Sequence, residues 1–302
     1  MQNPKTTEQD RRTIELWRAM TTLDDYVGFV EPKRHNILKL IRQLERFRNT
    51  PQGPKKKSIS LMIIATPGSG KNQLVECLAK HAGLQLLSFD ISQMTSKGEI
   101  LDCFGTIVTA ASQQVAGGRE VLVFFDELNA PIQGHTVFEA FLDPLDKSEY
   151  VRFGKTFRML PCAWLFAGTR RPRESRTDGA IPSKAEDFES RLTVQPLEFK
   201  PIDSPEAHLE NVYLGAWLIK KELPATKYVT EKVIRVFERM PYTMTPRAIL
   251  NFVRQFQNVR IGKVHSRNIP RHALISLPAF DIEGWDTTEA NRKEGELVDL
   301  IL

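Results

Sequence analysis

The sequence predicts an α/β fold: a five-stranded parallel sheet covered by helices on both faces, followed by a small all-helical domain. Three observations predict it. Short apolar runs alternate with helical patterns between about residues 51 and 200, as in parallel sheets. From about residue 205 the pattern is helical throughout. Hydrophobic residues make up 41% and charged residues 26% of the 302 residues, which is typical of a chain with a packed core.

The expected elements follow the apolar pattern along the chain. Helices are expected at 10–26 and 32–48. Five strands are expected at 59–65, 84–90, 121–126, 163–168 and 193–197, with helices at 72–81, 99–116 and 136–143 between them. Later helices are expected at 205–222, 229–239, 245–260 and 270–276. The chain thus divides into N-terminal helices (1–50), an α/β domain (51–200), a helical domain (201–280) and an acidic tail (281–302), whose end L-V-D-L-I-L fits either a short docking helix or a frayed end.

Composition excludes several classes of protein. The apolar runs are strand-length and too short for a membrane span, and the first ten residues hold no signal-peptide core. Cys77, Cys103 and Cys162 form no C-x-x-C pair, and the six His residues lack ligand spacing. We therefore expect a cytoplasmic protein without membrane partner, disulfide frame or zinc site. A net charge of +5 permits a nucleic-acid partner without strongly favouring one.

Residues 65–73, A-T-P-G-S-G-K-N-Q, lie between an expected strand and an expected helix. This context suits a phosphate-binding loop of the form G-x-x-x-x-G-K-[S/T], in which glycines let successive N–H groups converge on a phosphate. Two positions depart from it, because Ala65 replaces the first Gly and Asn72 replaces the hydroxyl residue that binds Mg²⁺. Alone, the stretch also fits a glycine-rich turn. The expected nucleotide contacts are Pro67, Gly68, Ser69, Gly70, Lys71, Asn72 and Gln73.

A second motif supports the nucleotide site. V-L-V-F-F-D-E-L-N places Asp126 and Glu127 at the end of an apolar strand, after Lys71 in the chain. Burying charge is costly, so paired carboxylates at a buried strand end need a reason. A bound Mg²⁺ supplies one: Asp126 would hold the ion, together with Asn72 or a water in its place, and Glu127 would polarise the attacking water. The competing interpretation is an exposed acidic strand end.

With these motifs in order, the chain resembles the AAA+ ATPase family over roughly residues 24–260. The resemblance implies ATP binding, with Thr169 as the sensor 1 residue and Arg247 as sensor 2 in a helical lid. It implies that Arg191 is an arginine finger acting on the neighbouring subunit. Arg170, Arg171, Arg173 and Arg176 are rivals for that role. The segment Y-V-G-F-V-E, with Val27 and Gly28, resembles the segment that lines the adenine pocket.

The stretch S-E-Y-V-R-F-G-K-T-F-R-M-L-P, at 148–161, reads as a β-hairpin because two β-prone runs flank a Gly-containing turn. An added hairpin before sensor 1 marks the presensor-1 branch of AAA+ proteins. D-E-L-N-A-P and T-P-R-A-I-L further resemble signatures of the MoxR-like members of that branch. This resemblance implies a homo-oligomeric, hexamer-like ring that remodels a protein substrate or adaptor. The loop region S-Q-M-T-S-K-G-E lacks the aromatic residue of threading members, which argues against processive unfolding.

Three functional hypotheses remain open from the sequence. The first is an ATPase that remodels or disassembles a protein partner. The second is a nucleic-acid-associated ATPase, favoured by the lysines at 55–57 and the arginines at 170–176 but opposed by the lack of aromatic stacking platforms among them. The lysine run also fits a solvated loop. The third is a non-hydrolysing ATP-dependent scaffold. Mg²⁺ demands near-ideal octahedral geometry, so Asn72 predicts a poorly held ion and slow hydrolysis.

Overall fold

The computed structural model describes part of the chain. The described residues are 26, 33–53, 56–116, 120–133, 137–172, 183–200, 204–222, 237, 240–241, 243–255, 263–264 and 297–298. The chain forms two compact units, one comprising residues 23–26 and 31–200 and the other residues 1–22, 27–30 and 201–302. The helices expected at 10–26 and 270–276 lie outside the described residues apart from Tyr26, as does nearly all of 229–239.

The first unit is built on a five-stranded parallel sheet. Its strands are β1 (Ile59–Ala65), β2 (Gln85–Asp90), β3 (Val121–Asp126), β6 (Ala163–Gly168) and β7 (Leu197–Phe199), in the order β2-β3-β6-β1-β7. All neighbours pair in parallel. This confirms the predicted fold class, and the bounds of β1, β3 and β6 are as predicted. The register aligns Asp90 with Asp126, so two acidic residues end adjacent strands.

The fifth strand was expected at 193–197, and that prediction is wrong in its bounds. Pro196 has no N–H to donate to a ladder, so the strand begins after it. Thr193 makes a different connection to β1. Its N–H donates to the Ser60 carbonyl at 2.8 Å, and its hydroxyl oxygen accepts the Ser60 N–H at 2.9 Å. Thr193 thus ties the chain to β1 before the short edge strand starts.

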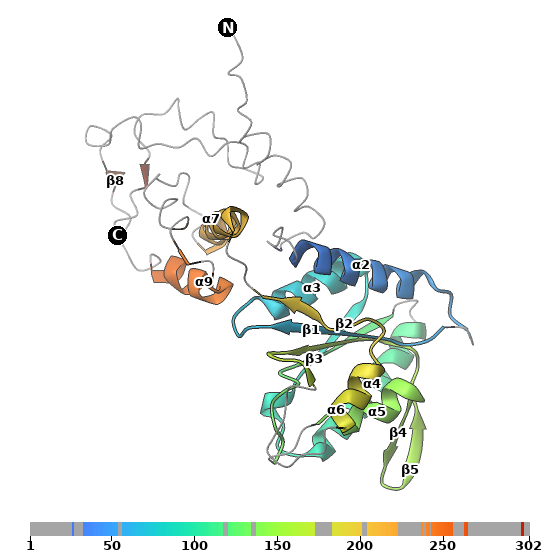
Figure 1. Cartoon of the computed structure of the whole chain (residues 1–302). Helices are drawn as coiled ribbons and strands as arrows, with labels where there is room; N and C mark the ends of the chain where they lie inside the picture. The colour runs from blue at the N-terminus through green and yellow to red at the C-terminus, as the bar shows by residue number, and fades with distance from the viewer. Residues whose placement is uncertain are drawn as a thin grey trace. The chain divides into compact units, whose positions relative to one another are not determined.

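Helices cover both faces of this sheet (Figure 1). On one side lie α2 (Lys33–Asn49) and α3 (Lys71–Ala82), and on the other α4 (Lys97–Ala116), α5 (Glu139–Asp146) and α6 (Ser183–Ser190). A hydrophobic core lies on each face of the sheet, and successive strand residues point into opposite cores because side chains alternate across a strand. Phe124 packs with α2 and α3, and Phe125 packs with α4 and α5. Between β2 and α4 a short 3₁₀ turn, η1 (Ile91–Gln93), redirects the chain. The helix predicted at 136–143 begins and ends later, and Pro144 is buried within it.

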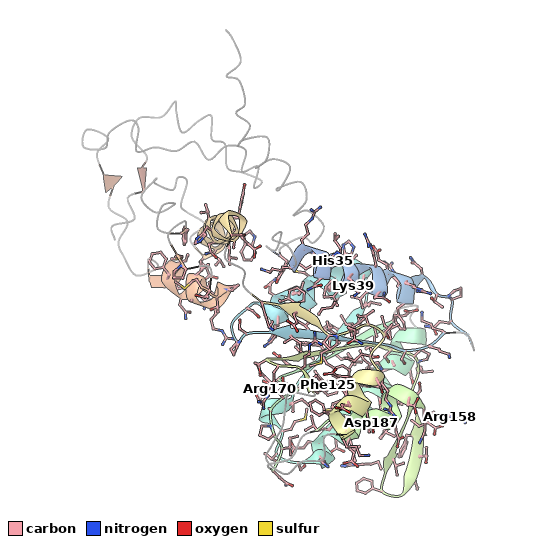
Figure 2. The ribbon with its side chains drawn as sticks, in the orientation of Figure 1. His35, Lys39, Phe125, Arg158, Arg170 and Asp187 are labelled. Atoms are coloured by element: carbon pink, nitrogen blue, oxygen red, sulfur yellow. The ribbon has the colours of Figure 1, made fainter. Side chains whose placement is uncertain are left out.

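The core on the α4 side is aromatic. Phe125 and Trp164 stack with ring centroids 6.2 Å apart, and Phe104 and Phe141 meet them edge-on. Figure 2 labels Phe125 in the interior of this unit. Since offset-stacked and edge-to-face pairs are the favourable aromatic geometries, this cluster fixes β3 and β6 firmly. Asp126 ends β3, and Thr169 directly follows β6.

The predicted hairpin is present. It consists of β4 (Glu149–Arg152) and β5 (Lys155–Arg158), which pair antiparallel. Phe153 and Gly154 both have positive φ, at 50° and 72°, as a two-residue hairpin turn that matches strand twist requires. Arg152 donates to the Gly98 carbonyl at 3.0 Å and pairs with Asp102, which attaches the hairpin to α4.

The second unit contains the helices α7 (Pro205–Glu222) and α9 (Pro246–Gln255), which pack against each other. The bounds of α7 are as predicted. Phe237 packs on α7 at Gly215, where a Cβ would lie 2.6 Å from the Phe237 ring, so only glycine allows this approach. In the tail, β9 (Leu297–Val298) pairs with β8 (Lys263–Val264), so these two residues do not form the docking helix. Among the described residues, no helix is both long and apolar enough to cross a bilayer.

Lys56 is neither a solvated residue nor a contact for a phosphate backbone. Its side chain is buried, pairs with Glu120, donates to the Thr50 carbonyl at 2.8 Å and lies over the Phe47 ring at 4.4 Å. Glu120 also accepts a hydrogen bond from Gln52 at 3.0 Å. This buried pair joins the loop before β1 to the residue before β3. The lysine run therefore offers fewer charges to a partner than the sequence suggests.

We expect Lys56→Met to lower the free energy of unfolding by about 3–5 kcal/mol, because it leaves the Glu120 carboxylate buried without its partner. The double variant Lys56→Met, Glu120→Met removes both charges, and its free energy of unfolding is expected to be closer to that of the wild type. Urea denaturation of the three proteins measures both effects. A single variant as stable as the wild type would show that the pair contributes nothing.

Candidate active site

The loop between β1 and α3 has the backbone form of an anion site. Gly68 and Gly70 lie in the left-handed region, with φ of 76° and 83°. Gly70 is the N-cap of α3, and no side chain caps the helix there. The first N–H groups of a helix lack intrahelical partners and carry a partial positive charge. N–H groups at such a helix start are suited to bind phosphate.

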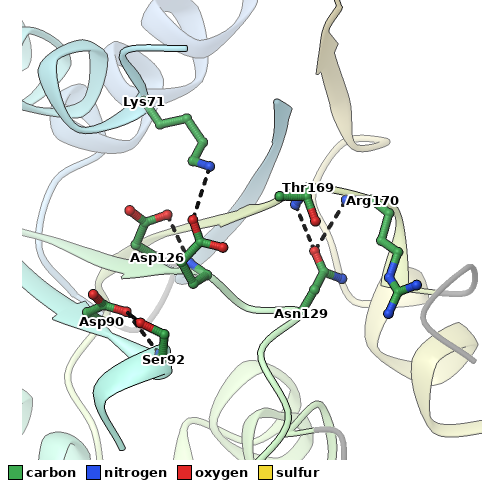
Figure 3. Close-up of polar contacts among 8 residues, drawn as sticks. Lys71, Asp90, Ser92, Asp126, Asn129, Thr169 and Arg170 are labelled. Atoms are coloured by element: carbon green, nitrogen blue, oxygen red, sulfur yellow. Dashed lines mark hydrogen bonds and ion pairs between the residues drawn. The ribbon is translucent and has the colours of Figure 1, made fainter. Parts of the chain in front are cut away.

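Lys71 and the carboxylates that end β3 come together (Figure 3). The Lys71 ammonium lies 3.5 Å from a Glu127 carboxylate oxygen, although the two residues are 56 positions apart. Asp126 accepts the Glu127 N–H at 2.8 Å. Lys71 itself is buried, and Glu127 is partly exposed. Three predicted site residues are therefore neighbours at the carboxyl edge of the sheet, where ligands bind in open α/β folds.

Glu127 has an unusual backbone. Its φ is 55°, in the left-handed region that non-glycine residues seldom adopt. Such conformations cost on the order of 1–3 kcal/mol and persist where the surrounding structure holds them. Here the hydrogen bond to Asp126 and the bond from Leu128 N–H to the Ala167 carbonyl, at 2.9 Å, hold the turn. With this backbone, a Glu127 carboxylate oxygen lies 3.5 Å from the Lys71 ammonium.

Burial raises the pKa of the Asp126 carboxyl above its ordinary value of 3.8, and the nearby carboxylates of Glu127 and Asp90 add to the rise. The hydrogen bond from the Glu127 N–H and the charge of Lys71 act in the opposite direction without cancelling it. An acid whose pKa is raised on folding makes the folded protein bind more protons than the unfolded chain. Stability therefore falls as pH rises through the raised pKa.

We expect Asp126→Asn to raise the Tm of the nucleotide-free protein at pH 7, because the amide keeps the hydrogen bond from Glu127 and removes a desolvated charge. The advantage should vanish as pH falls below about 4, where the native carboxyl is protonated in both states. Thermal unfolding of both proteins from pH 7 downward measures this. A variant less stable than the wild type at pH 7 would mean that the ionised carboxylate is favourable in the free protein.

The residues present fit a magnesium ion bound together with a nucleotide. Among the described residues no group of three or more His, Cys, Asp or Glu side chains gathers as a metal cage. Mg²⁺ seldom needs one, because it usually takes one or two carboxylates, several waters and substrate phosphates. Asp126 supplies such a carboxylate beside Lys71. Asn72 is exposed in the first turn of α3, where the usual hydroxyl ligand would stand.

Thr169 and Arg170 follow β6 directly, and both are exposed. Their backbone N–H groups donate to the same atom, the Asn129 side-chain oxygen, at 2.9 and 3.3 Å (Figure 3). Asn129 lies two residues after Glu127 and did not figure among the predicted site residues. The available signal was a polar residue directly after the buried Leu128. Its partner lies forty positions away, which the sequence does not indicate.

The arginines predicted to act on nucleotide are placed as follows. Arg191 follows α6, donates to the Asp187 carbonyl at 2.6 Å and lies 3.9 Å from Asp146. Arg171 pairs with Glu198 at 3.0 Å. Arg247 is exposed at the start of α9, in the second unit. Val27, Gly28, Arg173 and Arg176 lie outside the described residues.

Residues 61–170 match the family model for the ATPase family associated with various cellular activities (AAA). This segment is similar to the AAA ATPase family. The matched AAA segment runs from β1 through the phosphate loop and the Asp126–Glu127 strand end to Arg170. This similarity supports ATP binding and ATPase chemistry in general terms. No curated protein matches the chain.

Two solved structures share the AAA fold of this chain. A mutant of RuvB from Thermotoga maritima has a TM-score of 0.52 at 15% identity, covering 78% of this chain and 64% of its own. NtrX from Brucella abortus, in complex with ADP, has a TM-score of 0.51 at 16% identity, covering 81% of this chain and 52% of its own. The chain thus spans between half and two thirds of these relatives. At such identities the likeness shows the fold alone.

Proposed function

We propose that this AAA protein binds ATP with Mg²⁺ at the loop 65–73 and hydrolyses it, as an oligomer that remodels a protein partner. The observation that carries the proposal is the 3.5 Å approach of the Lys71 ammonium to the Glu127 carboxylate, beside Asp126 at the end of β3. A phosphate-binding lysine, a metal-binding carboxylate and a general base are the parts that phosphoryl transfer requires. The uncapped start of α3 adds donors for the phosphates.

The residues have distinct roles in this proposal. Backbone N–H groups of residues 68–73 bind the phosphates, Pro67 contacts the nucleotide without an N–H to donate, and Lys71 contacts the β- and γ-phosphates. Asp126 would hold Mg²⁺, with Asn72 or a water completing the coordination; the ion would neutralise charge on the phosphates. Thr169 contacts the γ-phosphate or the attacking water. The resemblance also assigns Val27 and Gly28 to adenine binding and Arg247 to nucleotide sensing.

The Lys71–Glu127 pair determines when Glu127 can act as a general base. Without nucleotide, the ammonium neutralises the carboxylate that is proposed as the general base. When phosphates take over the ammonium, Glu127 is released to accept a proton from the attacking water. The base thus becomes competent only when the nucleotide is bound. Slow turnover is expected, because Asn72 replaces the hydroxyl ligand of Mg²⁺.

Arg191 is proposed to act on the nucleotide of the neighbouring subunit. Its guanidinium sits at the end of α6, where it has partners in its own chain but keeps partial exposure. A mixing experiment tests the proposal. Lys71→Met has a dead site but supplies Arg191, whereas Arg191→Ala has an intact site but no finger. We expect the mixture to hydrolyse ATP faster than the mean of the two separate variants; a rate at that mean would contradict action between subunits.

A nucleic-acid role is the second candidate, because Arg170 is exposed beside the proposed site. The burial of Lys56 weakens it by removing one of the three loop lysines from the surface. Affinity for single- and double-stranded DNA that falls steeply with salt would support this role. No binding at low salt would exclude it and leave a protein partner.

A further inference from the structure

Asn129 connects two strand ends at the proposed site. It belongs to the turn after β3, two residues past Glu127, and its side-chain oxygen accepts the N–H groups of Thr169 and Arg170 after β6. The backbone of the same turn is held twice more. Leu128 N–H donates to the Ala167 carbonyl at 2.9 Å, and Ala130 N–H donates to the Glu127 carbonyl at 2.8 Å. The amide of Asn129 is therefore presented by a rigid turn.

The end of β6 is shaped around this amide. A Cβ placed on Gly168 would lie 2.2 Å from the Asn129 oxygen and 3.1 Å from its amide carbon. Real Cβ atoms do not approach so closely, so any residue other than glycine at 168 would displace Asn129. Gly168 has an ordinary strand backbone within β6, so glycine is needed here for space, not for conformation.

The two hydrogen bonds fix the direction of Thr169. In an extended strand, consecutive N–H groups point to opposite sides. Here the consecutive N–H groups of Thr169 and Arg170 both donate to the Asn129 side-chain oxygen. The chain must therefore turn at Thr169, directly after the last strand residue. Thr169 is exposed beyond that turn, on the same edge of the sheet as Glu127. A water molecule in place of the amide would satisfy both N–H groups without linking them to the Glu127 turn.

We propose that Asn129 is a positioning residue for ATP hydrolysis, which holds Thr169 at a set distance from Glu127. The inference rests on the proposed function, because it assigns Asn129 a role in the same reaction. Asn129 acts through the backbone of Thr169 and does not itself touch the reacting atoms. A group that orients the attacking water must be placed accurately. A displacement of that group by about 1 Å lowers the rate of hydrolysis on the order of 100-fold.

Two substitutions separate positioning from general support of the fold. Asn129→Ala removes the acceptor, whereas Asn129→Asp keeps an oxygen that accepts both N–H groups. We expect Asn129→Ala to lower kcat about 10- to 100-fold with KM for ATP changed less than about threefold. Asn129→Asp should retain kcat near the wild-type value on the plateau of its pH profile.

Gly168→Ala reaches the same contact from the other side and should reproduce the kcat loss of Asn129→Ala. Hydrogen exchange at the Thr169 and Arg170 amides reports the contact without turnover. We expect faster exchange in Asn129→Ala and wild-type exchange in Asn129→Asp. A drop in Tm shared equally by the Ala and Asp variants, with kcat unchanged on the plateau, is the signature of a purely structural role and overturns the proposal.

The outcomes distinguish this proposal from the proposed function. If wild-type ATP turnover exceeds that of Glu127→Gln while Asn129→Ala matches the wild type, only the role of Asn129 fails. If Asn129→Asp is as slow as Asn129→Ala, acceptance of the two N–H groups is not what matters, and the role fails again. If wild-type turnover does not exceed that of Glu127→Gln, the proposed function fails, and the positioning role fails with it.

Discussion

Replacing Lys71 by Met is expected to weaken ATP binding at least about 30-fold, because removing one partner of a buried charge contact costs at least about 2 kcal/mol. The Lys71 side chain is buried, so the apolar side chain of Met should fill its place at the start of α3 without unfolding the loop. The glycine geometry at 68 and 70 is independent of this side chain. Titration of a fluorescent ATP analogue in the presence of Mg²⁺ measures the change.

A matched control lies on the same helix. Lys80 is exposed near the end of α3, far along the helix from the phosphate loop. Lys80→Met removes the same charge from the same element and should leave ATP affinity within about twofold, as surface charges away from the ligand contribute little. Equal affinities for Lys71→Met and the wild type would contradict a nucleotide site at 65–73.

Replacing Glu127 by Gln is expected to lower kcat for ATP hydrolysis by about 100- to 10,000-fold, the range that loss of a general base produces. ATP binding should persist, because Lys71 and the backbone N–H groups of the loop remain. The uncharged Gln side chain in Glu127→Gln cannot form an ion pair with the Lys71 ammonium. Nucleotide affinity should therefore rise slightly. Phosphate release under saturating ATP measures kcat.

Glu76→Gln provides the control, because Glu76 is exposed on α3 and away from the strand end. It should turn over ATP at the wild-type rate. A Glu127→Gln protein that hydrolyses as fast as Glu76→Gln would remove Glu127 from the reaction. The same Glu127→Gln protein, loaded with ATP, is suited to capture a partner, because it should retain the nucleotide.

Some of these features could be predicted from the sequence because their causes are local. The central strands β1, β3 and β6 are mostly apolar runs buried on both faces, so their bounds were predictable. The glycine and lysine spacing in 65–73 also acts locally, through backbone angles and a helix N-terminus. The edge strand β7 has only three residues, and its start depends on Pro196 and on Thr193 bonding to Ser60.

Other features depend on contacts between distant parts of the chain. Lys56 stood in a basic run, and only its pairing with Glu120, 64 positions away, places it inside. Asn129 gains its role from N–H groups forty positions later. The approach of Lys71 to Glu127 was predictable because the loop that leads to Lys71 follows β1 and Glu127 follows β3, and the carboxyl ends of parallel strands meet at one edge of the sheet.

Asn72 departs from the phosphate-loop pattern, which has a Ser or Thr hydroxyl at this position as a ligand for Mg²⁺. An amide oxygen reaches farther than a hydroxyl, and Mg²⁺ tolerates little distortion of its octahedron. The remaining parts of the site, Lys71, Asp126 and Glu127, are assembled. We therefore favour a slow ATPase over a scaffold in which ATP only joins subunits. Thr at this position would restore the usual ligand.

The most direct test of this account is the Mg²⁺-dependent release of phosphate from ATP by the wild-type protein. We expect slow release that stops when the metal is chelated and that exceeds the Glu127→Gln rate by at least about 100-fold. Release that is absent, or no faster than that of Glu127→Gln, would contradict hydrolysis at the end of β3.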